Sequence, residues 1–159
     1  MKRLMLVLCL VVSSAYGGWS SNFTTSQKKA KADDKLMLVN FTGKKWCSYC
    51  IKQEKNIFKK TAFKNFAKAH LVLVELDFPS GRKPKKSLQE LKKKFKVSGF
   101  PTVIVLDPEG TEVARYGGYN SSLTVEKYVE RLEKLVNAYK TKAEDAAEKG
   151  KKKGSKKRK

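Results

Sequence analysis

The sequence predicts an α/β fold with one central mixed β-sheet and helices on both of its faces. Apolar runs of strand length alternate along the chain with segments in which apolar residues recur at helical spacing. A helical segment connects the first two runs, which is typical of a parallel βαβ unit. The last two runs are joined by the turn sequence DPEG, which is typical of an antiparallel hairpin.

The predicted strands are compact apolar runs bounded by turn residues. They are residues 36–41 (LMLVNF), 71–78 (LVLVELDF), 102–107 (TVIVLD) and 111–116 (TEVARY). Gly43 marks the turn after the first strand, so the chain is expected to change direction there.

Helices are predicted where apolar residues recur every three or four positions. Residues 47–70 form one long helix, or two in succession with a break near Thr61. Ser87 is expected to begin a shorter helix, and the polar stretch 19–35 is expected to hold another.

The clearest helix lies near the C-terminus and is expected to be capped by Ser122 or Thr124. Its apolar residues fall on one stripe, with charged residues elsewhere. The stripe consists of Val125, Tyr128, Val129, Leu132, Leu135, Val136 and Tyr139.

The two ends of the chain differ from this body. Residues 1–17 combine a basic start, an apolar run too short to span a bilayer and small residues, which predicts a cleaved export signal peptide. An uncleaved anchor is the alternative. Residues 18–140 are predicted as one domain. Residues 141–159 are predicted as a basic, disordered tail because they end in EKGKKKGSKKRK, which has no apolar residue.

The chain is strongly basic, with 36 Lys or Arg against 15 Asp or Glu among 159 residues and a formal net charge of +21. A protein with this charge is attracted to anionic surfaces. The lysine-rich tail could therefore bind anionic lipid headgroups, cell-wall polymer or nucleic acid, or it could be a solvated end.

The stretch WCSYC contains a C-x-x-C pair, Cys47 and Cys50, which could be a redox pair, half of a metal site or a structural disulfide. Removal of the signal peptide removes Cys9, and two thiols with the single His70 are too few for a closed tetrahedral zinc site. A structural disulfide over so short a loop would add little stability. The redox interpretation is therefore favoured, and no metal ion or other cofactor is expected.

The order and spacing of motifs carry a resemblance. WCSYC follows an apolar strand and begins a helix, and GFPT leads into a later strand before DPEG. Residues 36–139 resemble the thioredoxin superfamily in these features. FTGKKWCSYC with LVLVELDFP is most similar to exported bacterial thioredoxin-like proteins related to the soluble domains of thiol:disulfide interchange systems. The resemblance implies a thioredoxin fold and a redox-active disulfide between Cys47 and Cys50.

The resemblance also implies roles around the pair. Cys47, at the N-terminus of a helix where backbone N–H groups stabilise a thiolate, is the expected nucleophile, and Cys50 is the expected resolving thiol. Pro101 matches the cis-proline of the superfamily. Trp46 and Phe100 are expected to lie beside the pair and to contact substrate.

One departure from the superfamily concerns the proton acceptor for the resolving cysteine. Thioredoxins usually carry a buried aspartate at the position of Asn40, and an amide cannot take a proton at neutral pH. Glu75 on the neighbouring strand is the expected substitute acid or base. The alternative is that Glu75 is a solvent-facing strand residue.

His70 is expected to end its helix, where a positive charge is favourable, rather than to act in catalysis.

We therefore expect an exported, periplasmic or secreted, thiol-disulfide oxidoreductase that acts on the disulfides of other exported proteins. Reduction is favoured over oxidation or isomerisation. An upstream thiol electron donor is expected, and the protein is expected to be a monomer. The alternative is a basic binding module that docks an anionic partner, with the cysteine pair dispensable.

Overall fold

The computed structural model describes residues 18–156, with the backbone alone described for residue 147 and residues 149–156. The predicted signal peptide, residues 1–17, lies outside this range, as do residues 157–159 of the predicted tail. No helix within residues 18–156 is both long and apolar enough to cross a membrane.

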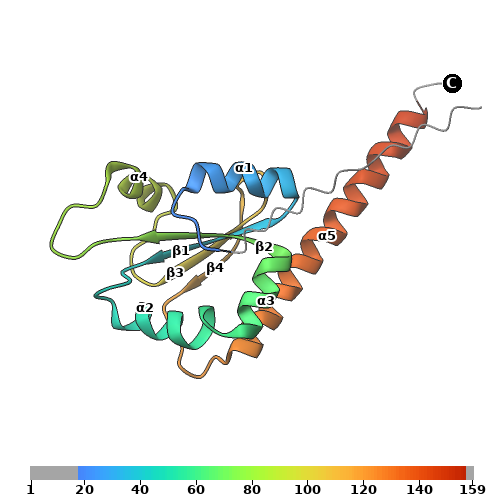
Figure 1. Cartoon of the computed structure of the whole chain (residues 1–159). Coiled ribbons are helices and arrows are strands. Elements are labelled where there is room, and N and C mark those ends of the chain that lie inside the picture. Colours follow the sequence, from blue (N-terminus) through green and yellow to red (C-terminus); the bar gives the residue numbers. More distant parts are fainter. Residues whose placement is uncertain (1–17, 157–159) are drawn as a thin grey trace, which may run out of the picture.

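A four-stranded mixed sheet with the strand order β2-β1-β3-β4 forms the centre of the molecule (Figure 1). β1 (Leu36–Thr42) pairs in parallel with β2 (Leu71–Asp77) and antiparallel with β3 (Thr102–Leu106). β3 is joined by the tight turn to β4 (Glu112–Gly117), which forms an antiparallel hairpin with it. The predicted strands, the parallel βαβ unit and the terminal hairpin are confirmed.

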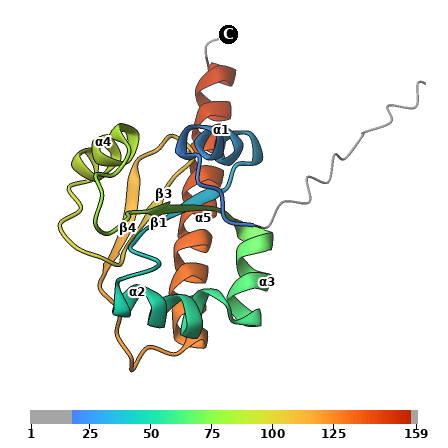
Figure 2. The same ribbon diagram turned by 60° about the vertical axis from the view of Figure 1, so that its left-hand side comes forward.

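Helices cover both faces of the sheet, as predicted (Figures 1 and 2). One face carries α1 (Phe23–Asp33) and α4 (Lys86–Lys94). The other face carries α3 (Thr61–His70) and α5 (Val125–Lys156), with the helical segment that follows β1. This is the arrangement of the thioredoxin fold that the resemblance implied.

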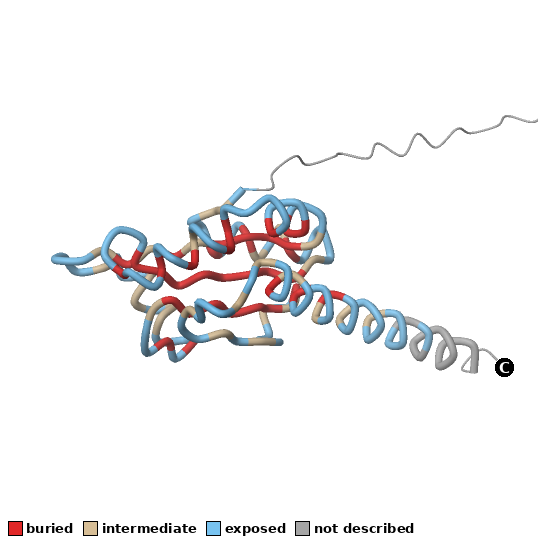
Figure 3. The backbone as a smooth tube through the Cα atoms, turned by 90° about the horizontal axis from the view of Figure 1, so that it is seen from below, coloured by how far each residue is buried: buried red, intermediate tan, exposed pale blue. Residues whose placement is uncertain are grey.

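Both cores are built by the alternation of side chains along the strands. On β1, Met37 and Val39 point to the α1 and α4 side, whereas Leu36 and Leu38 point to the α3 and α5 side. Every residue of β1 is buried, and Figure 3 shows the buried centre of the molecule between its exposed helices. A strand covered on both faces is usually apolar throughout, so the polar Asn40 within it requires an explanation.

The segment between β1 and β2 contains α2 (Ser48–Gln53), a π-helical turn η1 (Glu54–Phe58) and α3. The predicted break near Thr61 is confirmed, because Lys60 has an extended backbone and α3 begins at the next residue. Sequence periodicity did not predict the π turn, in which the N–H of Lys59 donates to the carbonyl of Glu54. Turns of this type inside helices often occur at functional sites.

Two helix starts refine the expected ones. α4 begins one residue earlier than predicted, at Lys86, and no side chain caps it, so Ser87 is not its cap. Thr124 rather than Ser122 precedes α5, and its Oγ1 accepts the N–H of Lys127 over 3.4 Å.

The C-terminal tail differs from the expectation of disorder. The backbone of residues 141–156 continues α5 as a regular helix, which extends beyond the sheet (Figures 1 and 3). Alanine, glutamate and lysine in the stretch KAEDAAEK are strong helix formers. Extending a helix that is already anchored by its apolar stripe requires no new nucleus, so the absence of a core-forming face did not end it.

Candidate active site

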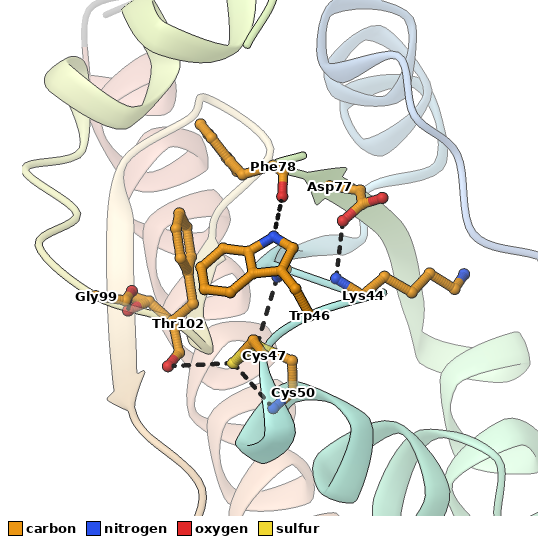
Figure 4. The surroundings of a disulfide bond; sticks show 10 residues. Lys44, Trp46, Cys47, Cys50, Asp77, Phe78, Gly99 and Thr102 are labelled. Atoms are coloured by element: carbon orange, nitrogen blue, oxygen red, sulfur yellow. Dashed lines mark hydrogen bonds between the residues drawn. A yellow bond between two sulfur atoms is a disulfide. The ribbon is translucent and has the colours of Figure 1, made fainter. Parts of the chain in front are cut away.

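Cys47 and Cys50 lie at the start of the helical segment that follows β1, and they form a disulfide with their Cα atoms 5.2 Å apart (Figure 4). Cys47 is the N-cap of α2, and Cys50 lies within its first turn. The exposed fraction is 8% for Cys47 and 3% for Cys50, so a partner reaches Cys47 more easily. The predicted pairing is confirmed, and this difference supports the predicted order of attack.

Backbone N–H groups point at both sulfur atoms. The N–H of Cys50 lies 3.3 Å from Cys47 Sγ, and the N–H of Gly43 lies 3.4 Å from Cys50 Sγ. In the dithiol state these donors can stabilise a thiolate on either cysteine, and the positive end of the helix dipole adds to the effect at Cys47. The local backbone therefore favours the reactive, ionised form of the pair.

Trp46 closes one side of the disulfide (Figure 4). Its indole N–H donates to the carbonyl oxygen of Phe78 over 2.6 Å, and its ring meets the ring of Phe100 edge-on at 5.9 Å. A Cβ at Gly43 would lie 2.5 Å from Trp46 Cε2, so a larger residue there would force the indole to shift. Trp46 keeps an exposed fraction of 47%, so an aromatic surface remains available beside Cys47.

The predicted cis peptide bond is present between Phe100 and Pro101. The carbonyl oxygen of Phe100 lies 3.7 Å from Cys47 Sγ, so a polypeptide bound at this sulfur would also meet the backbone before the proline. Trp46, Phe100 and Pro101, predicted from separate parts of the chain, are thus brought together around the disulfide. Their contact with substrate remains a prediction.

Glu75 lies on the same face of the sheet as Asn40, because the two residues are partners in the parallel pairing of β1 with β2. Its Oε1 accepts a hydrogen bond from Lys44 Nζ over 2.7 Å, and this bond raises the pKa of Lys44. Within residues 18–156, no hydrogen bond joins Glu75 to Cys47 or Cys50. The acid or base role of Glu75 therefore remains a prediction.

Glu54 is a functional candidate that sequence reasoning missed. It follows Cys50 by four residues along the helix, and its Oε2 is buried without a hydrogen-bond partner in the described part of the chain. Burial raises the pKa of the Glu54 carboxyl, and the negative charge of Glu75 raises it further. The signal in the sequence was a carboxylate at an inward position of the helical stripe that also contains Ile57 and Phe58.

Two buried amides belong to the same region. Asn40 faces the cysteine helix from β1, and Gln53 lies beside Glu54 on that helix. Both are 3% exposed, and each has a side-chain oxygen without a hydrogen-bond partner among the described residues. We call Asn40, Gln53, Glu54 and Glu75 the polar cluster. It gathers proton-carrying and hydrogen-bonding groups on the side of the sheet that carries Cys50.

His70 does not belong to the site, because it ends α3 at the opposite end of the sheet. Its ring lies 4.9 Å from the ring of Phe66. Burial lowers the pKa of His70, and the positive charges of Lys140 and Lys35 lower it further. Burial and the two lysines thus oppose the expected positive form of His70, which the helix C-terminus favours.

Comparison with known proteins identifies close relatives. Residues 23–133 match the family described as a thioredoxin-like domain. The disulfide bond reductase DsbH of Chlamydia pneumoniae is 37% identical over 110 residues, an alignment that covers 67% of this chain and 66% of that protein. The thioredoxin-related protein DsbJ of the same organism is 26% identical over 107 residues, which cover 65% of this chain and 31% of DsbJ.

Structural comparison agrees with the sequence comparison. A solved structure of a DsbH oxidoreductase superposes with a TM-score of 0.64 at 34% identity, and the match covers 76% of this chain and 84% of that one. The family match spans the strand before the cysteine pair, the pair itself and the cis-proline segment. On these grounds the chain belongs to the thioredoxin-like family and is homologous to the DsbH oxidoreductase.

Proposed function

We propose that this protein is a thiol-disulfide oxidoreductase that reduces disulfide bonds in other exported proteins. The observation that carries the proposal is the Cys47–Cys50 disulfide at the start of a helix, beside the exposed indole of Trp46 and the segment before Pro101. The relative DsbH is a disulfide bond reductase, which favours reduction over oxidation or isomerisation.

The reaction is a two-step exchange. The Cys47 thiolate attacks one sulfur of a substrate disulfide and forms a mixed disulfide, and the other substrate sulfur leaves as a thiolate that takes a proton. The Cys50 thiolate then attacks Cys47 Sγ, which releases the second substrate sulfur and closes the Cys47–Cys50 disulfide. The substrate gains two electrons and two protons, and the cysteine pair loses them.

The second step needs a base to deprotonate Cys50. Asn40 cannot serve, because an amide does not take a proton at neutral pH. We assign this role to Glu75, which lies on the same face of the sheet as Asn40. Its carboxylate accepts a hydrogen bond from Lys44. Glu54, whose carboxyl has a raised pKa, is a second acid in the polar cluster through which the proton can pass.

Substrate recognition is assigned to the surface around Cys47. An extended substrate can pair its backbone with the segment before Pro101, in the manner of strand addition. The rings of Trp46 and Phe100 would then contact substrate side chains on either side of the disulfide. The bulk of Phe100 would influence which substrates fit.

The cellular setting follows from the sequence. The predicted signal peptide, residues 1–17, supports a periplasmic or secreted protein. Each reduction leaves Cys47 and Cys50 oxidised, so a further turnover requires an upstream thiol that reduces them again. We expect the protein to act as a monomer on its donor and its substrates.

A binding module is the second candidate function. The net charge of +21 and the projecting end of α5, whose sequence is rich in lysine, favour attraction to an anionic partner (Figure 1). In that function the cysteine pair would be dispensable, which separates it from the oxidoreductase.

The test is the reduction of insulin by dithiothreitol with and without the protein. The wild type should accelerate the reaction, Cys47→Ser should return it to the background rate, and Cys50→Ser should accumulate a mixed disulfide. Ser48→Ala, between the cysteines, is the matched control and should keep most of the activity. A wild type without activity that still binds polyanions would favour the binding module.

A further inference from the structure

Two hollows lie next to each other beside the active site. The first has a volume of about 570 Å³ and begins at Lys45 and Trp46. The second, of about 770 Å³, lies between the start of α1 and the loop that leads into α4. Because both are lined by Asp77, Pro79 and Arg82, they form one continuous groove that leads away from Trp46.

Positive charge dominates the walls of this groove. Lys45, Arg82, Lys83 and Lys85 line it and are exposed. None of the ion pairs between described residues includes any of these four side chains. We call the channel that they line the basic groove.

The carboxylates in the same groove are already engaged. Asp77 Oδ1 accepts the backbone N–H of Lys44 over 2.8 Å, and Glu75 Oε1 accepts from Lys44 Nζ over 2.7 Å. Among the described residues, neither carboxylate forms an ion pair with Lys45, Arg82, Lys83 or Lys85. A ligand with negative charge would be attracted to those cations without having to displace a carboxylate from them.

Two segments at opposite ends of the sheet differ in charge. From residue 79 to residue 100 the chain carries eight Lys or Arg side chains and a single acidic one, Glu90. Lys92 Nζ lies 5.5 Å from the ring centroid of Phe100, so this charge reaches the residue before the cis-proline. The β3–β4 turn, at the opposite end of the sheet, carries acidic residues and no basic ones at positions 107–112. The segment of residues 79–100 therefore brings positive charge to the surroundings of Phe100 and of the basic groove.

Resting on the proposed function, we propose that the basic groove binds an acidic segment of the partner polypeptide, next to the disulfide that this partner presents to Cys47. The groove begins at Lys45 and Trp46, next to Cys47 in the chain, so one polypeptide can present its disulfide to Cys47 and extend into the groove. Complementary charge at such a surface raises the rate of encounter and selects among partners. The disulfide is then chosen by its acidic surroundings as well as by its shape.

The test uses three peptides that each contain one intramolecular disulfide, flanked by aspartates, serines or lysines. The second-order rate constant of each peptide with the reduced protein is measured at low ionic strength. We expect the wild type to prefer the acidic peptide over the serine peptide. Combined reversal by Arg82→Glu, Lys83→Glu and Lys85→Glu should lower that preference about tenfold or more and leave the serine peptide nearly unaffected.

A control variant changes the net charge equally at a distance. Lys31, Lys68 and Lys142 are exposed, and the first two lie in the last turns of α1 and α3, away from the cysteines. Reversing these three should leave most of the preference intact. An equal loss of preference in both variants would overturn the basic groove, because net charge alone would then explain it. A wild type that reacts with none of the peptides would instead overturn the proposed function.

Discussion

The two ends of the sheet are built from the same strands but contain different kinds of side chain. We call the end beside Cys47 and Cys50 the cysteine end and the other the apolar end. In the parallel pairing of β1 with β2, Leu38 lies opposite Leu73, and two residues further on Asn40 lies opposite Glu75. All four side chains lie on the face of the sheet that α3 and α5 cover, since positions two apart on a strand share a face. The leucine pair is part of a continuous apolar core, whereas the amide and carboxylate belong to the polar cluster.

Among the described residues, the buried polar atoms without hydrogen-bond partners are concentrated at the cysteine end. Of the buried side-chain polar atoms without a partner in the described part of the chain, all but the hydroxyl of Tyr128 belong to Asn40, Gln53 and Glu54. Leaving a buried polar group unsatisfied costs about 1–3 kcal/mol. The unsatisfied polar groups near the cysteines therefore destabilise the fold, and the apolar core must offset this cost. Such a cost is common at functional sites.

The largest effect should come from damaging the apolar end. Leu38 is fully buried, so Leu38→Ala removes packed methyl groups and should lower the free energy of unfolding by about 2–5 kcal/mol. Urea denaturation measures this change. The fraction that remains folded should still exchange disulfides at the wild-type rate, because Leu38 lies outside the polar cluster. A slower exchange rate per folded molecule would show that the two ends are not separable.

At the cysteine end, Glu75→Gln should affect chemistry more than stability. Loss of a general base commonly slows proton transfer by about two orders of magnitude, so resolution of the mixed disulfide by Cys50 should slow, because the Cys50 thiol must then lose its proton to water or hydroxide. Single-turnover quenching of the mixed disulfide measures this step. Glu90→Gln, on the exposed surface of α4, is the control. Unchanged resolution across pH in Glu75→Gln would refute the role assigned to Glu75.

Sequence reasoning reached the apolar end and the cysteine pair because both depend on local patterns. Periodicity located the strands, and the C-x-x-C spacing with the resemblance located Cys47, Cys50 and Pro101. The bond between Lys44 and Glu75 and the burial of Glu54 depend on how separate segments pack, which no local pattern encodes. The same limit applies to the pKa of His70, which is set partly by Lys140 on another helix.

A smaller effect, on thermal stability, should follow from replacing the partly buried carboxyl of Glu54. Its raised pKa means that the folded state binds the proton more tightly than the unfolded chain does. Ionisation of Glu54 therefore lowers the stability of the fold as pH rises above 4.5. Glu54→Gln removes that loss and should raise Tm at pH 7 by roughly 2 °C, a modest change because the side chain is partly solvated. The gain should vanish near pH 4. A lower Tm at pH 7 would mean that the carboxylate is stabilised in the fold.

The smallest effect should appear at the opposite end, at His70. Its lowered pKa means that the unfolded chain binds the proton more tightly, so the contribution of His70 to stability is complete above pH 6.5 and declines as pH falls below it. It is the only histidine in the sequence, so its ring signals in an NMR titration report the pKa directly. We expect a midpoint below 6.5, and Lys140→Gln should move it upward because one repelling charge is removed. A midpoint above 6.5 would mean that the C-terminus of α3 outweighs burial and the neighbouring lysines.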